Sequence, residues 1–385
     1  SACSSTSAPA SLTDASTTDS AASDTSAIDT GAADTATLDS GARDAADAAD
    51  ATAIEVASDA TSVDGSTPSC LGDSYPITIA GQLPFVPVVI GTSSARFLFD
   101  TATTYSSIDP SGFTPGAPTS TNCSLTPALG ASCSYSELAF LGASPPASLV
   151  VESFGTIGGV REGGILATDF TSLGVYTIDW TGSRAHVATS TSFCARSALL
   201  GLGWRPLSTA GFFSSSLASL RPLGDVQAGA TSGFTVPNVP TIPSKIAGVS
   251  AFTQIDTGFD DDVTHHSVNV NVAFYAAIVA ADSGALVRDA SLDLSLSTCA
   301  GVSEPVQAYT LASGRSFTLV ADDGSTARSF SDAVIFVKQT PAAAKSCGGI
   351  GTWTVPAAQI GGSFAESLGI IAFDPYASVV WVAPG

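Results

Sequence analysis

Two stretches decide how this chain folds: Phe97-Leu98-Phe99-Asp100-Thr101-Ala102-Thr103 and Phe252-Thr253-Gln254-Ile255-Asp256-Thr257-Gly258. Each is a largely apolar run that ends in Asp, Thr and a small residue. This pattern predicts a buried strand that ends in a tight turn, with the aspartate at the end of the strand. Burying a lone carboxylate is costly, so each aspartate needs hydrogen-bond partners or a functional role.

The same order of segments follows both stretches. The first is followed by an apolar segment that leads into a glycine-type turn, at 164–170, and by an apolar strand at 174–180. The second is followed by similar segments at 359–364 and 369–375. The order of aspartate turn, long β segment, glycine-type turn and closing strand therefore occurs twice. An internal repeat of this kind predicts two matching halves.

The composition predicts an all-β protein. Among 385 residues there are 36 glycines and 21 prolines, and short runs rich in Val, Ile, Phe and Thr recur from residue 75 onward. Such runs, punctuated by turn residues, are typical of strands. Charged residues make up only 12% and the net charge is −21, which argues against a nucleic-acid partner and against a polybasic membrane patch.

The first 69 residues differ from the rest, being almost all Ala, Ser, Thr, Asp and Gly, with an aspartate every five residues from Asp14 to Asp44. Ordering such a segment would cost chain entropy with little burial in return. We therefore expect 1–69 to be a disordered acidic linker. Because the repeat predicts two halves, we expect 70–194 to form an N-terminal lobe that carries Asp100 and 195–385 to form a C-terminal lobe that carries Asp256.

The opening Ser1-Ala2-Cys3 is similar to the end of a bacterial lipobox. This resemblance implies that a signal segment has been removed, that Cys3 carries a lipid, and that the protein is exported to the cell envelope, periplasmic or surface-exposed. The lipid on Cys3 would be the only membrane attachment, because no apolar run is long enough to span a bilayer.

Six cysteines remain after Cys3, and an even set in an exported protein suggests disulfides. Six cysteines can pair in several ways, and proximity in the sequence favours Cys123–Cys133, Cys299–Cys347 and, by remainder, Cys70–Cys194. There is no C-x-x-C pair and there are only three histidines. We therefore expect neither a metal site nor a cofactor.

The doubled pattern resembles the pepsin-like aspartic peptidases, in which each lobe supplies an Asp-Thr-Gly loop and a hydrophobic-hydrophobic-Gly segment passes behind it. The resemblance covers about residues 76–385. It implies a bilobal fold with two pseudo-symmetric, barrel-like lobes and a central cleft. It also implies a monomeric endopeptidase whose Asp100 and Asp256 activate water against a peptide or protein substrate. Thr101 and Thr257 would hydrogen-bond across the lobes and keep the turns level.

The chain departs from this family at several positions. Ala102 stands where the family has glycine, whereas Gly258 keeps the glycine of the second loop. Thr103 supplies the hydroxyl that the family places after each loop, but Phe259 does not. The segment that passes behind each loop is called the crossing segment below, and Ala167 replaces the glycine of the first one. These changes bear on activity more than on fold.

The family also has a lid hairpin that carries a tyrosine over the substrate. Tyr135 is the best-placed candidate and Tyr105 the alternative. A competing interpretation makes Tyr135 a strand residue, half buried beside a disulfide. Two functions therefore stay open: an aspartic endopeptidase, and a pepsin-like surface lipoprotein that has lost catalysis and acts as a binding protein.

Overall fold

The described part of the protein is mostly β-sheet, as the sequence predicts, with 46% of the described residues in strands and 16% in helices. The computed structural model describes residues 68–126, 130–136, 138–144, 147–212, 239–259, 265–298, 301–347 and 349–385. Cys3 and the linker predicted for 1–69, apart from its last two residues, lie outside these ranges. The described strands form three sheets.

The first ten-stranded sheet is built entirely from the chain between residues 78 and 166. Its main path runs β2 (Thr78–Ala80), β3 (Leu83–Ile90), β4 (Ser93–Phe99), β11 (Val160–Leu166), β5 (Ser107–Ile108), β9 (Ala147–Val151), β7 (Gly130–Tyr135) and β6 (Asn122–Thr126). Two short strands join it from the side: β10 (Thr156–Ile157) pairs with β11, and β8 (Leu138–Phe140) pairs with β3.

The second ten-stranded sheet is built from the chain between residues 241 and 360. Its path runs β18 (Leu286–Arg288), β20 (Ser303–Leu311), β23 (Val334–Lys338), β17 (Ser267–Asn271), β24 (Ala357–Ile360), β16 (Val249–Ile255), β15 (Thr241–Ile246), β21 (Phe317–Val320) and β22 (Thr326–Phe330). A further strand, β19 (Leu294–Ser297), pairs with β20. The ten-residue helix α3 (Val272–Ala281) follows β17 directly.

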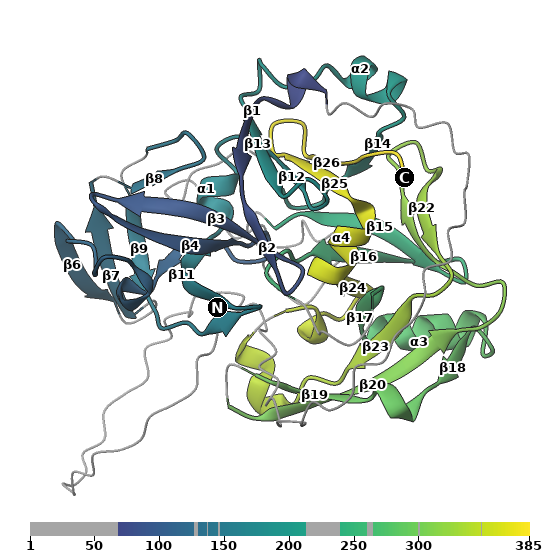
Figure 1. Ribbon diagram of the computed structural model, residues 1–385. Helices are drawn as coiled ribbons and strands as arrows, with labels where there is room; N and C mark the ends of the chain where they lie inside the picture. Colours follow the sequence, from purple (N-terminus) through teal and green to yellow (C-terminus); the bar gives the residue numbers. More distant parts are fainter. Residues whose placement is uncertain are drawn as a thin grey trace, which may run out of the picture.

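A six-stranded antiparallel sheet takes three strands from each half of the chain. Its order is β1 (Asp73–Pro76), β13 (Arg184–Ala188), β12 (Val175–Asp179), β25 (Ile370–Asp374), β26 (Val379–Val382) and β14 (Arg205–Ser208). The halves meet where β12 pairs with β25. In Figure 1 this sheet lies above and between the two larger sheets, the first to the left and the second to the lower right.

The two larger sheets repeat one local arrangement around the aspartate turns. In the first, β11 runs parallel to β4 and antiparallel to β5. In the second, β24 runs parallel to β16 and antiparallel to β17. Each crossing strand leads into a short helix, α1 (Thr168–Thr171) or α4 (Gly362–Leu368), and then into the six-stranded sheet. The repeat read from the sequence is therefore present in the strand pairing.

The hydrophobic core is continuous through all three sheets. The largest buried cluster includes Phe99 at the end of β4, Tyr176 of β12 and Phe373 of β25. The ring of Phe99 lies 5.8 Å from that of Tyr176 and 6.1 Å from that of Phe373. Burial of aromatic side chains contributes strongly to core stability, so this cluster fixes the two halves against the shared sheet.

The prediction of barrel-like lobes is wrong, because within the described residues no sheet closes into a barrel. The first sheet path ends at β2 and β6, and the second ends at β18 and β22. Closure would require each pair of end strands to hydrogen-bond with each other. The predicted lobe boundary at 194/195 stays a prediction.

Two of the three predicted disulfides are confirmed. Cys70 and Cys194 are bonded across a sequence separation of 124, and Cys123 and Cys133 join adjacent strands across a separation of 10. The third prediction, Cys299–Cys347, stays a prediction, because Cys299 lies outside the residues that the structure describes. Disulfides of this kind suggest an oxidising, exported environment. No helix in the described ranges has the length and apolar character needed to cross a bilayer.

Candidate active site

Asp100 sits directly after β4, where its backbone N–H donates to the carbonyl of Leu166 at 3.0 Å. Asp100 is 2% exposed, and its carboxylate accepts three hydrogen bonds from its own turn. The N–H groups of Ala102 and Thr103 donate to Oδ1 at 2.7 and 3.2 Å, and the Thr103 hydroxyl donates to Oδ2 at 2.6 Å. The turn therefore satisfies this buried carboxylate, and Thr103 contributes the hydroxyl that the sequence predicts.

Asp256 takes the same place after β16. Its N–H donates to the carbonyl of Ile360 at 2.9 Å, and the N–H of Gly258 donates to Oδ1 at 3.0 Å. The other oxygen, Oδ2, is bonded from outside the turn, because the side-chain amide of Gln359 donates to it at 2.5 Å. Asp256 is fully buried. Gln359 is a site residue that the sequence analysis missed.

The two turns are tied to each other by their threonines. The hydroxyl of Thr101 donates to the backbone carbonyl of Ile255 at 2.6 Å, and the hydroxyl of Thr257 donates to the backbone carbonyl of Phe99 at 2.5 Å. Each hydroxyl also accepts the backbone N–H of the other threonine, at 3.1 and 3.3 Å. The predicted cross-link between Thr101 and Thr257 is therefore present, and it brings residues 156 positions apart in the chain into one rigid unit.

The carboxylate of Asp100 packs directly against the second turn. A side chain at Gly258 would place its Cβ 2.6 Å from the Cγ of Asp100, so glycine is required there for close approach. The pKa of Asp256 is raised well above its usual value, first by burial and then by the negative charge of Asp100. Two neighbouring carboxylates in a dry site do not both ionise, and they titrate as a pair.

Ala102 occupies the position that matches Gly258, and its surroundings accept the methyl group. Ala102 is half buried and packs against an apolar cluster of the second half of the chain that includes Val239, Ile350 and Trp353. The two turns are therefore not equivalent, since one needs a glycine and the other fills a small apolar gap. The departure at Ala102 fits the packing without displacing the first turn.

The crossing segments hold both turns from behind. The N–H of Thr168 donates to the carbonyl of Thr103 at 2.9 Å, and the N–H of Gly362 donates to that of Phe259 at 2.6 Å. A Cβ at Gly361 would collide with the carbonyl oxygen of Phe259, so the glycine of the second crossing segment is a packing requirement.

At the first crossing segment the backbone N–H of Ala167 donates to the Ser106 hydroxyl, at 2.8 Å. The same hydroxyl donates to Asp169 Oδ1 at 2.6 Å, and the Ser106 N–H donates to Oδ2 at 3.1 Å. Burial raises the pKa of Asp169 to about 6 even with these donors. Ser106 and Asp169 therefore clamp the first turn to α1, a contact that the sequence motifs did not indicate.

The prediction of Tyr135 as a lid tyrosine is wrong. Tyr135 is 3% exposed and belongs to the main hydrophobic cluster, near the disulfide of Cys133. Burial raises the pKa of its hydroxyl. A ring held in the core cannot cover a substrate, so the competing interpretation of a buried strand tyrosine holds. Tyr105, the alternative, is partly exposed.

A third carboxyl group lies in the electrostatic neighbourhood of Asp100. Glu162 of β11 is 3% exposed, and its Oε1 has no hydrogen-bond partner within the described residues. Burial, followed by the negative charges of Asp100 and Glu152, raises the pKa of Glu162 to about 8. Glu162 therefore holds a proton at neutral pH and adds little negative charge to the site.

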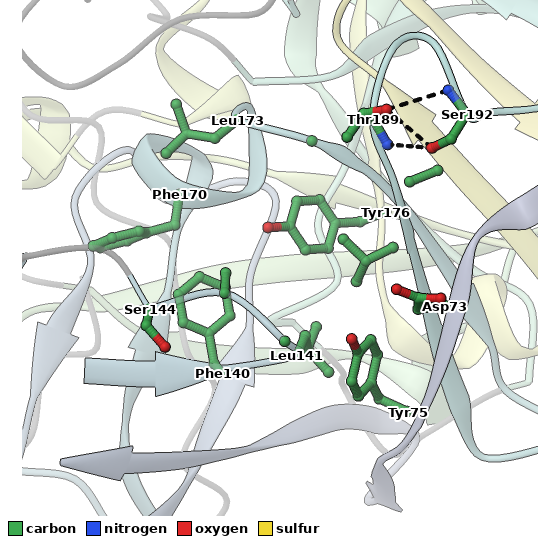
Figure 2. Close-up of a pocket in the computed structure, with 15 residues that line it drawn as sticks. Asp73, Tyr75, Phe140, Leu141, Ser144, Phe170, Leu173, Tyr176, Thr189 and Ser192 are labelled. Carbon is green, nitrogen blue, oxygen red and sulfur yellow. Dashed lines mark hydrogen bonds between the residues drawn. The ribbon is translucent and has the colours of Figure 1, made fainter. Parts of the chain in front are cut away.

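A cavity of about 520 Å³ lies away from the carboxylate pair, beside α1, the end of β8 and strands β12 and β13 (Figure 2). Its lining includes the rings of Phe140, Phe170 and Tyr176 and the carboxylate of Asp73. Neither aspartate of the paired turns belongs to that lining. The cavity is therefore not where the paired carboxylates act.

Within the described residues, no three His, Cys, Asp or Glu side chains gather closely enough to hold a metal ion. Neither the protein-family models nor the curated proteins compared with this chain give a match.

Proposed function

We propose that this protein is a pepsin-like aspartic endopeptidase with a bilobal fold and that Asp100 and Asp256 are its catalytic residues. The observation that carries the proposal is the reciprocal hydrogen bonding of Thr101 and Thr257 between two buried aspartate turns. Further support comes from the repeated strand arrangement behind each turn and from the sheet that both halves share.

The proton of the pair resides on Asp256 in the free protein. Asp256 is fully buried and its carboxylate accepts two hydrogen bonds, from Gly258 and Gln359, whereas the carboxylate of Asp100 accepts three from its own turn. More donors favour the charged form, and deeper burial favours the neutral form. Asp100 is therefore the base and Asp256 the acid.

The reaction follows from this assignment. Asp100 accepts a proton from a water molecule, whose oxygen attacks the carbonyl carbon of the peptide bond. Asp256 donates its proton to the carbonyl oxygen, which gives a neutral tetrahedral diol. Collapse of the diol breaks the C–N bond. The nitrogen leaves as an amine with the proton from Asp100, and a diol hydroxyl returns a proton to Asp256. The products are a carboxylic acid and an amine, and both aspartates regain their starting forms.

Cleavage of a denatured protein between pH 3 and pH 6 tests the proposal. Wild type is expected to cut, whereas Asp100→Asn and Asp256→Asn are each expected to lose more than about a hundredfold in kcat/KM, since each removes one proton-transfer group. Asp73→Asn, the same chemical change outside the site, serves as the matched control and retains activity. Cleavage that survives Asp100→Asn would rule out this mechanism.

The second candidate is a binding protein with the same fold and no catalysis, and the apolar Phe259 beside Asp256 is the observation that favours it. Such a protein would bind an unfolded peptide with similar affinity in wild type and in Asp100→Asn, and wild type would leave the peptide intact at every pH. Cleavage and binding measured on the same peptide therefore separate the two functions.

We further propose that residues 1–69 tether the folded part to the cell envelope through a lipid on Cys3. The disulfides Cys70–Cys194 and Cys123–Cys133 support export. The test is the mass of the N-terminal peptide from membrane-extracted protein, compared with Cys3→Ser. An unmodified Cys3 in the membrane fraction would refute the tether.

A further inference from the structure

The two halves can be aligned residue by residue at their carboxylates. Leu166 pairs in parallel with Phe99, directly before the first aspartate. Ile360 pairs in parallel with Ile255, directly before the second. The N–H of each aspartate donates to the crossing residue of its own half, at 3.0 and 2.9 Å. The strand register therefore fixes which positions correspond.

With this alignment Thr103 matches Phe259, and Ile165 matches Gln359. In the first half the turn residue, Thr103, donates its hydroxyl to Oδ2 of Asp100. The crossing-strand residue, Ile165, is apolar and buried. In the second half the turn residue, Phe259, is apolar and buried. The crossing-strand residue, Gln359, donates its side-chain amide to Oδ2 of Asp256. Donor and apolar side chain have exchanged places.

We propose that Gln359 is the positioning residue of Asp256, and that it supplies from the crossing strand the hydrogen bond that Thr103 supplies to Asp100 from the turn. This inference rests on the proposed function, in which Asp256 is the catalytic acid. It gives the departure at Phe259 a specific compensation, because the hydrogen bond that the turn lacks is made by another element.

The sheet holds Gln359 rigidly in place. Its backbone lies between two neighbouring strands, in register with Gln254 of β16 on one side and Asn269 of β17 on the other. All three amides are buried, and side chains in register project from the same face of a sheet. Without Gln359, the only remaining donor to the Asp256 carboxylate in the described residues would be the N–H of Gly258, and an unsatisfied buried oxygen is costly.

The repeat itself supplies the test variants. Gln359→Ile installs the residue found in the first half and removes the donor. Phe259→Thr installs the hydroxyl of the first half, and the double variant recreates the first-half arrangement around Asp256. Gln254→Leu is the matched control, because it removes a neighbouring buried amide that the structure does not bond to Asp256, and leucine is the first-half residue there.

Two readouts are measured on each variant: the pH profile of peptide cleavage, and the titration of Asp256 followed by carboxyl ¹³C NMR on aspartate-labelled protein. A donor favours the carboxylate, so Gln359→Ile is expected to raise the pKa of Asp256 by about one unit or more and to move the alkaline limb of the activity profile upward. We expect kcat to fall about tenfold or more. The double variant restores both, and Gln254→Leu changes neither.

An Asp256 pKa that is the same in Gln359→Ile and wild type overturns the inference, as does a folded double variant that keeps the pKa of the single one. The NMR readout needs no activity. A wild type that does not cleave peptides therefore refutes the proposed function, while the pKa comparison still decides whether Gln359 holds Asp256.

Discussion

We predict that the buried carboxyl group of Glu162 makes a contribution to the stability of the protein that is lost as the pH rises. Glu162 has a pKa of about 8 in the folded protein, raised from its ordinary 4.5 by burial and by the charge of Asp100. Between pH 4.5 and pH 8 the folded state therefore keeps a proton that the unfolded chain has already released. Stability from this group is complete below pH 4.5 and is lost as the pH rises to 8.

The size of the effect follows from that pKa. A rise from 4.5 to about 8 corresponds to about 5 kcal/mol of unfolding free energy lost above pH 8, of which about 3 kcal/mol is already lost at pH 7. Glu162→Gln removes the ionisation and keeps the shape. The difference in stability between variant and wild type should therefore move in favour of the variant by several kcal/mol between pH 5 and pH 8.

Urea unfolding followed by fluorescence of the buried tryptophans, at pH 5, 6, 7 and 8, measures this difference. Titrating groups far from Glu162 are common to both proteins and cancel in the comparison. Any fixed cost of the new amide adds the same offset at every pH. Glu366→Gln, the same change on the partly exposed face of α4, is the control. A variant-to-wild-type difference that is equal at pH 5 and pH 8 would refute the reasoning.

Three further predictions concern the turns and the first disulfide. Thr257→Val removes the donor to the Phe99 carbonyl and should cost about 2 kcal/mol of unfolding free energy, together with most of the peptidase activity, as measured by urea titration and cleavage on the same preparation. Ala102→Gly removes a packed methyl and should cost about 1 kcal/mol while activity stays within a few-fold of wild type; an increase in stability would contradict the packing described. Replacing Cys70 and Cys194 together by serine should cost about 5 kcal/mol, because the bond closes a loop across a sequence separation of 124; a thermal midpoint equal to that of wild type without reducing agent would contradict this.

The strands before Asp100 and Asp256 could be predicted because apolar runs that end in Asp-Thr-small leave few alternatives to a buried strand and a turn. The crossing segments could be predicted because the repeat placed them in the same order twice. The threonine cross-link followed from the resemblance to a known family. These features are local in sequence or recur within the chain.

The remaining features depend on strand register and on packing over long sequence distances. The donation from Gln359 to Asp256 requires knowing that β24 pairs with β16 one residue before the aspartate. The raised pKa of Glu162 depends on burial by segments far along the chain. The sequence left both the lid and the buried-strand interpretations of Tyr135 open, because its strand position does not tell which face of the sheet is covered. Whether a sheet closes into a barrel likewise depends on which strands pair at its edges, and the composition of the chain does not specify that pairing.

The most direct test of the central claim is the titration of Asp256 in wild type and in Asp100→Asn, by carboxyl ¹³C NMR. In wild type the pair should titrate in two separated steps, because burial and the charge of Asp100 raise the pKa of Asp256 well above its usual value. In Asp100→Asn a single step should remain, at a lower pH than in wild type, because the neighbouring negative charge is gone. An Asp256 that titrates at the same pH in both proteins would show that the two carboxyl groups do not share a proton.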